Sequence, residues 1–497
     1  MSLSEVEFAF FLPAVLAGYW LLPRRAAWQN GWLVAASCLF YATWHWKLLG
    51  LLVASTLVDY AVGRYLGATA PAAGAVADSR VTGRRRLALA LSLAVNLGAL
   101  GFFKYEAFFA ESLNALLGAL GLPAPLPVLR LVLPLGLSFY TLQKLGYVID
   151  VHDGRLPACR SLVTFAAFTA FFPQLTAGPI SRGRQLLPQL ERPREPAPAM
   201  FASGAATFLL GFTLKAFVAD SLGTAIVDPV FAAPGTFSPG AHWGALLAYA
   251  LQVFSDFCGY SLLAIGAGRF FGIELPVNFN LPFLSTSVME FWRRWHITLN
   301  TWLFDYIYGP LVTSKGWWRN RLDLGFLLVF LVSGLWHGAR WTFVAWGLIH
   351  GLALVAHRRW DEFYRGLCRR DRTWVARRRG PAYLAAAWLL TQGVFVLALV
   401  PFRAPSLDAA LQFAGGLAWG GERTLDLGGV QGVLTLALCA GILAAYHVLG
   451  GLDLGRRAWS RFLALPAPVR GVAYGLAVAL LALVTPLAGG QFIYAQF

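Results

Sequence analysis

The 497-residue chain is 58% hydrophobic and only 13% charged, with a mean hydropathy of +0.60. Soluble domains carry close to twice that charged fraction, so the composition excludes an ordinary soluble protein and favours a chain whose solvent is lipid. A net charge of +16 is typical of nucleic-acid binders. Here, however, the basic residues lie in short segments between apolar runs. This distribution excludes the continuous basic face that nucleic-acid binding requires.

The apolar runs predict the fold class. A membrane-spanning helix needs ~20 predominantly apolar residues, and many stretches qualify. We expect an all-α polytopic membrane protein with roughly a dozen membrane helices plus interfacial or re-entrant helices, in a single domain over residues 1–497. The strongest stretches are 7–22, 31–43, 47–63, 87–103, 131–149, 161–178, 203–219, 243–267, 324–350, 383–401, 430–449 and 470–488.

The first apolar stretch is predicted to be a retained helix. It carries Glu5 and Glu7 where a secretory leader has basic residues, and no small-residue cleavage site follows it.

Basic segments between the apolar runs predict the orientation. Arg24 and Arg25 follow the first run, Arg84–Arg86 precede the fourth, and the loop expected at 357–380 has nine Arg against three acidic residues. Such clusters mark the cytoplasmic face of a membrane protein. We therefore expect the N-terminus outside a cell (inner) membrane, and contact between these segments and anionic lipid.

The segment 276–310 is too polar for a simple span. Pro276 and Pro282 end the preceding helix, and Ser287 is placed to cap a new one in a capping box with Glu290. Glu290 is also placed to pair with the arginines that follow it three and four residues later. One apolar stripe of this interfacial helix would contain Trp292, His296, Leu299 and Leu303, with Arg293 and Arg294 beside it.

His337 lies inside the stretch 324–350, which is otherwise an ordinary membrane helix. An ionisable side chain at membrane depth is costly and indicates function by default. Gly334 and Gly338 form a GxxxG step that lets another backbone approach closely, so we expect His337 to face a protein-lined space, flanked by Trp336. A histidine that only bridges two helices is the structural alternative.

Other candidates are weaker. Asp256 is an acidic group in a long apolar run that either orients a histidine or joins two helices. His350 is expected to be interfacial, and His45 is expected in an aromatic belt. The five cysteines have no CxxC spacing and predict no disulfide framework and no metal site; they are Cys38, Cys159, Cys258, Cys368 and Cys439.

Acyl transfer suits two histidines without a metal or a serine nucleophile. A neutral alcohol needs a base to take its proton before it attacks a thioester, and histidine has the appropriate pKa. A second polar group can orient the thioester carbonyl or stabilise the oxyanion. The residues alone do not select this reaction over others.

Several motifs in chain order resemble the membrane-bound O-acyltransferase (MBOAT) family. WRRWH at 292–296 and GLWHGARWTFVAWG at 334–347 are similar to its two histidine segments. Four further segments resemble its bacterial branch, nearest to the membrane subunits of alginate O-acetyltransferases: FFLPAVLAGYWLLP at 10–23, PLGLSFYTLQKLGYVIDV at 134–151, FFPQLTAGPISR at 171–182 and FSDFCGYSLLAIGAGRFFGIELPVNFNLPF at 254–283.

The resemblance implies a helical membrane bundle around a central tunnel. His337 would be the central base and His296 the second histidine, nearer the cytoplasmic side. Acetyl-CoA or another acyl thioester would be the donor substrate, with no bound cofactor. The acyl group would leave toward a polysaccharide outside, through a secreted hydrolase-like acyltransferase partner.

Further residues and functions stay open. Tyr140 and Gln143 either line the tunnel or pack, and Trp336, Trp292, Arg293 and Asp256 are the other candidate tunnel residues. The aromatic ending, with Phe492, Tyr494 and Phe497, is expected to anchor at the interface or to dock at the tunnel exit or on a partner. The alternative functions are transfer of D-alanine or a longer acyl group to cell-wall polymers and, in another class, a non-enzymatic transporter or flippase.

Overall fold

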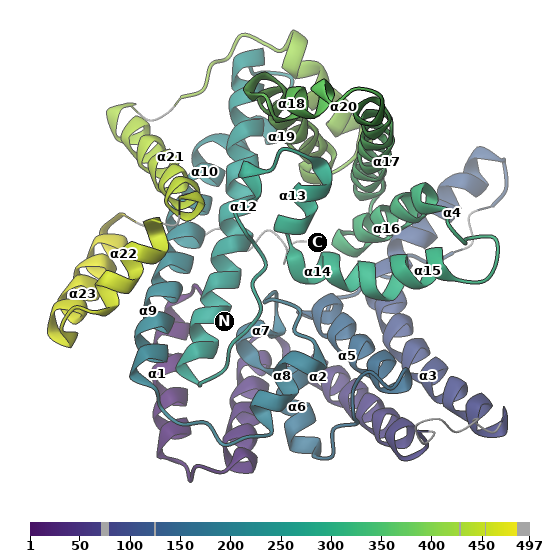
Figure 1. Ribbon diagram of the computed structural model, residues 1–497, viewed down its shortest axis with the longest axis vertical. Coiled ribbons are helices and arrows are strands. Elements are labelled where there is room, and N and C mark those ends of the chain that lie inside the picture. The colour runs from purple at the N-terminus through teal and green to yellow at the C-terminus, as the bar shows by residue number, and fades with distance from the viewer. Residues whose placement is uncertain (71–78, 124–125, 427–428, 453, 485–497) are drawn as a thin grey trace. The chain divides into compact units, whose positions relative to one another are not determined.

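A computed structural model describes the chain except residues 71–78, 124–125, 427–428, 453 and 485–497. Within the described residues the secondary structure is helical, apart from an isolated bridge between Phe237 and Arg423 (Figure 1). This confirms the predicted all-α class. Two compact units form: the first comprises Met1–Phe208 and Tyr260–Pro276, and the second Leu209–Gly259 and Val277–Phe497.

The first unit is built from the N-terminal helices. Its elements are α1 (Val6–Leu21), α2 (Ala26–Ala68), α3 (Ser79–Leu100), the π-helix η1 (Gly101–Tyr105), α4 (Glu106–Ala119), α5 (Leu137–His152), α6 (Leu162–Ala170), α7 (Phe172–Leu175) and α8 (Gly183–Leu190), with parts of α9 (Pro198–Phe212) and α12 (Pro239–Phe270).

Two of the predicted spans, 31–43 and 47–63, lie in the single helix α2. His45 has non-helical backbone angles there, φ −161° and ψ 92°, so the helix is kinked between the two apolar stretches. The predicted span 161–178 is likewise divided, because α6 ends at Ala170 and α7 begins at Phe172.

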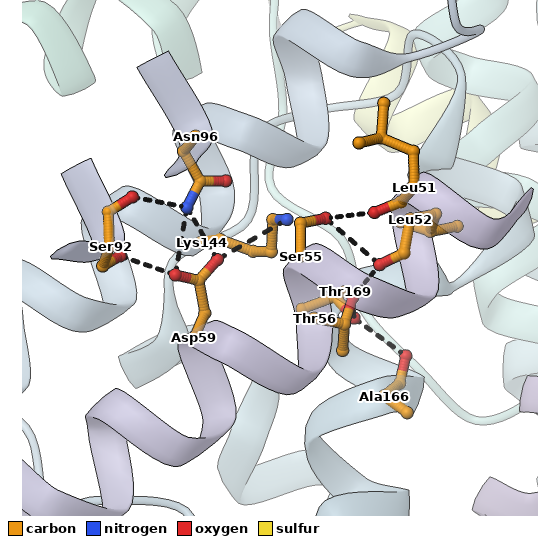
Figure 2. Close-up of polar contacts among 10 residues, drawn as sticks. All are labelled: Leu51, Leu52, Ser55, Thr56, Asp59, Ser92, Asn96, Lys144, Ala166 and Thr169. Carbon is orange, nitrogen blue, oxygen red and sulfur yellow. Dashed lines mark hydrogen bonds and ion pairs between the residues drawn. The ribbon is translucent and has the colours of Figure 1, made fainter. Parts of the chain in front are cut away.

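A buried carboxylate joins three helices of the first unit (Figure 2). Asp59 of α2 accepts hydrogen bonds from Ser92 Oγ at 2.5 Å and from Asn96 Nδ2 at 2.9 and 3.0 Å, both on α3. Lys144 Nζ of α5 lies 3.5 Å from the same carboxylate, and both side chains of this ion pair are 0% exposed. We call these four residues the Asp59 network. It pairs a buried charge with an opposite charge and with donors, as burial requires.

The second unit contains the remaining elements. They are η2 (Thr213–Ala219), α10 (Asp220–Leu222), η3 (Gly223–Val227), α11 (Asp228–Ala232), most of α12, η4 (Pro282–Leu284), α13 (Val288–Arg294), α14 (Ile297–Leu303), η5 (Phe304–Tyr308), α15 (Gly309–Thr313), α16 (Leu322–His337), α17 (Trp341–Arg370), α18 (Thr373–Arg379), α19 (Pro381–Arg403), α20 (Leu407–Trp419), α21 (Gly429–Gly451), α22 (Leu454–Leu463) and α23 (Ala467–Val484).

The predicted single helix 324–350 is wrong. α16 ends at His337, Gly338 is extended, and α17 returns from Trp341 as the second arm of a hairpin. Glycines allow the arms to touch. A Cβ on Gly334 would lie 2.2 Å from the carbonyl oxygen of Phe343, and one on Gly347 2.3 Å from that of Phe330. The close backbone approach predicted at Gly334 is therefore confirmed, but the partner is the next helix in the chain.

The basic segment 357–380 is helical rather than a loop, because α17 continues to Arg370 and α18 follows. Arg358 and Arg359 both pair with Asp323 at the start of α16. This contact holds the open end of the hairpin, opposite the end that carries His337.

Six helical stretches of the described chain are long and apolar enough to cross a membrane, or seven if one bent pair counts as a span. The other predicted spans are shorter or broken helices, among them Val6–Leu21 and Leu322–His337. The six are Ala26–Ala68, Arg80–Ala119, Pro198–Ala232, Pro239–Phe270, Pro381–Arg403 and Gly432–Gly451.

Candidate functional site

His296 lies in a break between two short helices. The predicted cap is confirmed, because Ser287 Oγ accepts a hydrogen bond from the backbone N–H of Glu290. In a capping box the Glu290 carboxylate would accept from the backbone N–H of the N-cap residue, Ser287. Here it accepts from the backbone N–H of the preceding residue, Thr286. Glu290 also pairs with Arg294 at 2.8 Å, as predicted from their spacing.

The continuous helical stripe predicted through His296 is wrong. Trp295 is extended, and His296 has φ 45° and ψ 52°, in the left-handed region that costs a residue with a Cβ roughly 1–2 kcal/mol. Such strained positions persist where surrounding contacts fix them, and they concentrate at functional sites. Because of this break, the His296 side chain does not continue the face of α13 on which Trp292 lies.

Hydrogen bonds fix this strained turn. Ile297 N–H donates to the carbonyl of Asn278 at 2.9 Å, and Thr298 Oγ1 bonds to Asn278 Oδ1 at 2.6 Å. Asn300 Nδ2 donates to the carbonyls of Trp292 and Trp295, at 2.9 and 2.5 Å. Hydrogen bonds made by residues before and after His296 therefore stabilise its strained backbone conformation.

The fold brings His296 and His337 together. Their ring centroids lie 6.4 Å apart, and Trp336 lies beside both, 5.6 Å from His296 and 5.0 Å from His337. The two histidines are 1% and 4% exposed. We call His296, His337 and Trp336 the histidine site. Sequence reasoning had selected all three residues from two separate motifs.

Aromatic rings surround the histidine site. Phe257 of α12 is edge-on to His296 at 4.5 Å, and Phe402 of α19 and Trp346 of α17 lie 5.3 and 4.9 Å from His337. Burial lowers the pKa of His296, which lies outside the candidate spans, to about 3. Its ring is therefore uncharged at neutral pH. An uncharged imidazole can accept a proton or orient a polar group, which are the capacities that acyl transfer needs.

The other predicted residues of the second unit lie in different settings. Trp292 is buried on α13, whereas the Arg293 guanidinium is exposed beside the Met289 sulfur at 3.7 Å. Asp256 forms an ion pair with Lys215 Nζ at 2.9 Å. Because Lys215 is on η2 and Asp256 on α12, this pair joins two helices, while a role for Asp256 toward a histidine stays a prediction.

Tyr140 and Gln143 belong to the first unit. Tyr140 is part of a buried cluster with Tyr41 and Leu52, and Gln143 Nε2 donates to the carbonyl of Phe168 at 2.8 Å. Their place in a tunnel stays a prediction. The C-terminal candidates Phe492, Tyr494 and Phe497 lie outside the described residues.

Sequence reasoning missed part of the site's surroundings. His350, expected at the interface, is 1% exposed and packs against Trp292 and Trp346, each at 4.8 Å. Its four-residue spacing from Trp346 was the available signal, because residues four apart share one face of a helix. Phe402 had no local signal, because its contact with His337 depends on how α19 packs. Among the described residues, no three His, Cys, Asp or Glu side chains gather as metal ligands would.

Comparison with known proteins identifies the class. Residues 155–400 match the membrane-bound O-acyltransferase (MBOAT) family. The chain is 39% identical over 458 residues to the probable alginate O-acetylase AlgI of Azotobacter vinelandii, covering 90% of this chain and 83% of the relative. It is 36% identical to the peptidoglycan O-acetyltransferase of Helicobacter pylori, covering 82% and 77%.

A more distant similarity, 31% identity over 46% of this chain and 57% of the relative, links it to the teichoic acid D-alanyltransferase of Streptococcus thermophilus. The chain belongs to the MBOAT family, and it is a multi-pass membrane acyltransferase. The transporter considered from the sequence is set aside by this membership.

Proposed function

We propose that this protein moves an acetyl group from a cytoplasmic coenzyme A thioester across the membrane, for O-acetylation of an extracytoplasmic polysaccharide. The observation that carries the proposal is the pairing of two buried histidines, 6.4 Å apart, that come from separate segments of the chain. The relatives named as alginate and peptidoglycan O-acetylating enzymes support an acetyl group and a glycan acceptor.

In this proposal His337 is the general base. A hydroxyl group, supplied in this proposal by the secreted partner, loses its proton to the uncharged ring of His337 as its oxygen attacks the thioester carbonyl. The carbon–sulfur bond then breaks, and the thiolate takes the proton from His337 and leaves as the free thiol of the carrier. His296 orients the carbonyl or stabilises the oxyanion. The ring of Trp336, beside both histidines, excludes water and limits hydrolysis of the thioester.

The orientation is part of the same proposal. The basic segment 357–380 lies on the cytoplasmic side of the inner membrane and the N-terminus lies outside. The open end of the α16–α17 hairpin, held by Asp323, then faces the donor, and His337 at the other end lies deeper in the membrane. A secreted acyltransferase partner receives the acetyl group and passes it to the polymer.

His337→Ala tests the proposal. We expect loss of O-acetyl groups from the cell's polysaccharides at normal protein abundance, whereas His152→Ala, at the partly exposed end of α5, retains them. Acetylation that persists in His337→Ala would assign His337 a packing role. Chemical analysis of the released ester distinguishes acetate from D-alanine, the group named for the more distant relatives.

A further inference from the structure

The structure divides the nine arginines of the basic segment 357–380 into two sets. In the first set, four arginines form ion pairs, so their charge is compensated within the protein. These pairs join Arg358 and Arg359 to both Asp323 and Glu362, and Arg365 and Arg378 to Asp361.

The second set contains the other five arginines. They form no ion pair with any residue that the structure describes, and all five are exposed. The last acidic group of the segment, Asp371, accepts hydrogen bonds from the backbone N–H and the hydroxyl of Thr373 instead. We call the five arginines the arginine surface. They are Arg369 and Arg370 at the end of α17, and Arg372, Arg377 and Arg379 at α18.

The arginine surface has a packed support, because α18 is fixed to α17 and lies beside α19 (Figure 1). Tyr364 of α17 is 3% exposed, and its hydroxyl donates to the carbonyl of Trp374 at 3.1 Å. The Tyr364 ring lies 5.5 Å from that of Tyr383 on α19. The ion pair of Arg378 with Asp361 is a second link between α18 and α17. The exposed arginines are therefore presented together by packed helices.

Exposed apolar side chains accompany these arginines. Arg372, Val375 and Arg379 share one face of α18, because residues three and four apart are neighbours on a helix. Val375 is 38% exposed, and Trp360 and Phe363 of α17 are 48% and 58% exposed. Arginines beside exposed aromatic and aliphatic side chains are typical of the headgroup level of a membrane, where cations meet phosphates and apolar groups meet the acyl chains.

The donor of the proposed function does not account for this surface. α17 advances about 35 Å from Trp346, which lies beside His337, to Arg369. An extended pantetheine arm spans only about 16 Å from its sulfur to its first phosphate. The diphosphate of a thioester held at His337 therefore ends well short of Arg369. The anion that a membrane protein meets at its headgroup level is the phosphate of an anionic lipid.

We infer that the arginine surface binds the phosphate groups of anionic phospholipids in the inner leaflet. The inference rests on the orientation in the proposed function, which places this segment on the cytoplasmic side. Guanidinium groups suit phosphate, because their N–H groups donate two parallel hydrogen bonds to its oxygens. Each arginine near an anionic leaflet strengthens the association about fivefold.

Photocrosslinking of lipid to the full-length protein in nanodiscs tests the inference. The probes are phosphatidylglycerol and phosphatidylcholine with the same photoreactive acyl chain, and peptide mapping gives the yield on segment 357–380 for each. We expect the wild type to favour phosphatidylglycerol. The double variant Arg372→Gln with Arg379→Gln should lower the ratio of the two yields about tenfold at about 0.15 M ionic strength. Both leaflets of a nanodisc have the same composition, so the result does not depend on the orientation.

A matched double variant removes the same charge from the paired set. Arg359 and Arg365 are also exposed, at 64% and 59%, but they pair with carboxylates. Arg359→Gln with Arg365→Gln should leave the ratio of yields within about twofold of the wild type, because screening limits the reach of a net charge. Equal losses in the two double variants would mean that only the total charge of the segment matters, and would overturn the inference.

A charge-retaining variant covers the case in which the glutamines disturb the fold. Arg372→Lys with Arg379→Lys should keep most of the preference for phosphatidylglycerol, since an ammonium group also attracts phosphate. A loss as large as that of the glutamine variant would indicate that these side chains act through packing, and would contradict the inference.

Competition identifies any other occupant of the arginine surface. Neither coenzyme A nor an acidic acyl carrier protein should lower the crosslinking of phosphatidylglycerol. Displacement by coenzyme A would assign the surface to the donor, and displacement by the carrier protein would assign it to a protein partner; either result overturns the inference. Crosslinking needs no turnover, so it should be unchanged in His337→Ala, whereas acetylation that persists in that variant contradicts the proposed function alone.

Discussion

Each unit of this protein contains a cluster of buried polar side chains, and the two clusters differ in their hydrogen bonding. In the first unit, the Asp59 carboxylate accepts bonds from Ser92 and Asn96 and pairs with the Lys144 ammonium (Figure 2). In the second unit, four side chains beside the histidine site bury hydrogen-bonding atoms without protein partners in the described chain: Trp292, Thr342, Trp346 and His350.

This difference separates a structural role from a functional one. A satisfied buried network stabilises the helices that contribute to it, and removing one member leaves the others unpaired. Buried groups without protein partners cost stability unless water or a ligand completes their hydrogen bonds. Substitutions in the Asp59 network should therefore change stability, and substitutions at the histidine site should change catalysis.

The largest effect is expected at His296. His296→Asn keeps a residue that tolerates the left-handed backbone at φ 45° and removes the imidazole. We expect acyl transfer to fall about 10³–10⁴-fold, within the range for loss of an acid–base or orienting group, with little change in thermal stability. The measurements are acyl-transfer rate and melting temperature in nanodiscs. A rate near that of the wild type would leave His296 as a packing residue.

Asp59→Ala should produce the opposite pattern. It leaves the Lys144 ammonium buried beside an empty position, which costs roughly 3–5 kcal/mol of folding free energy. The protein's abundance and melting temperature should fall, while activity per folded molecule stays close to that of the wild type.

The double variant Asp59→Leu with Lys144→Met is the control for that prediction. It replaces both charges by apolar groups of similar size and should recover most of the stability. If the double variant is as unstable as Asp59→Ala, the network matters through its shape and not through its charge.

Composition and motif order were enough to predict the helical membrane class and the three residues of the histidine site. Apolar stretches long enough to cross a bilayer follow directly from what lipid requires. His337 was conspicuous because an ionisable residue in such a stretch is rare. Ser287 and its cap were also predictable, because capping is decided within four residues.

Helix continuity was not predictable in the same way. The hydrophobic pattern predicts one helix over 324–350, since no proline near Gly338 would end it. The hairpin forms because Gly334 and Gly347 admit the backbone of the opposite arm, a tertiary contact with no local signature. The break at His296 and the pairing of Asp59 with Lys144 likewise depend on segments distant in sequence.

A smaller effect is expected from Gly334→Ala. The added Cβ would lie 2.2 Å from the Phe343 carbonyl oxygen, so α16 and α17 must separate. Such overpacking costs about 1–3 kcal/mol, and because His337 is three residues away, activity should fall together with stability. Gly393→Ala on α19, where nothing lies within 4 Å of the added carbon, is the matched control. Equal activity in both variants would show that His337 does not depend on the closeness of the hairpin.

The smallest effect is expected from Ser287→Ala, which removes the N-cap of α13 and costs about 1 kcal/mol. α13 spans only Val288–Arg294 and leads directly into the strained turn at His296, so activity should fall about fivefold. Ser406→Ala removes an equivalent cap from α20, where Ser406 Oγ accepts from the N–H of Ala409. Its stability loss should be similar and its activity unchanged. If the two variants lose activity equally, general destabilisation explains both, and the turn at His296 is held by its hydrogen bonds alone.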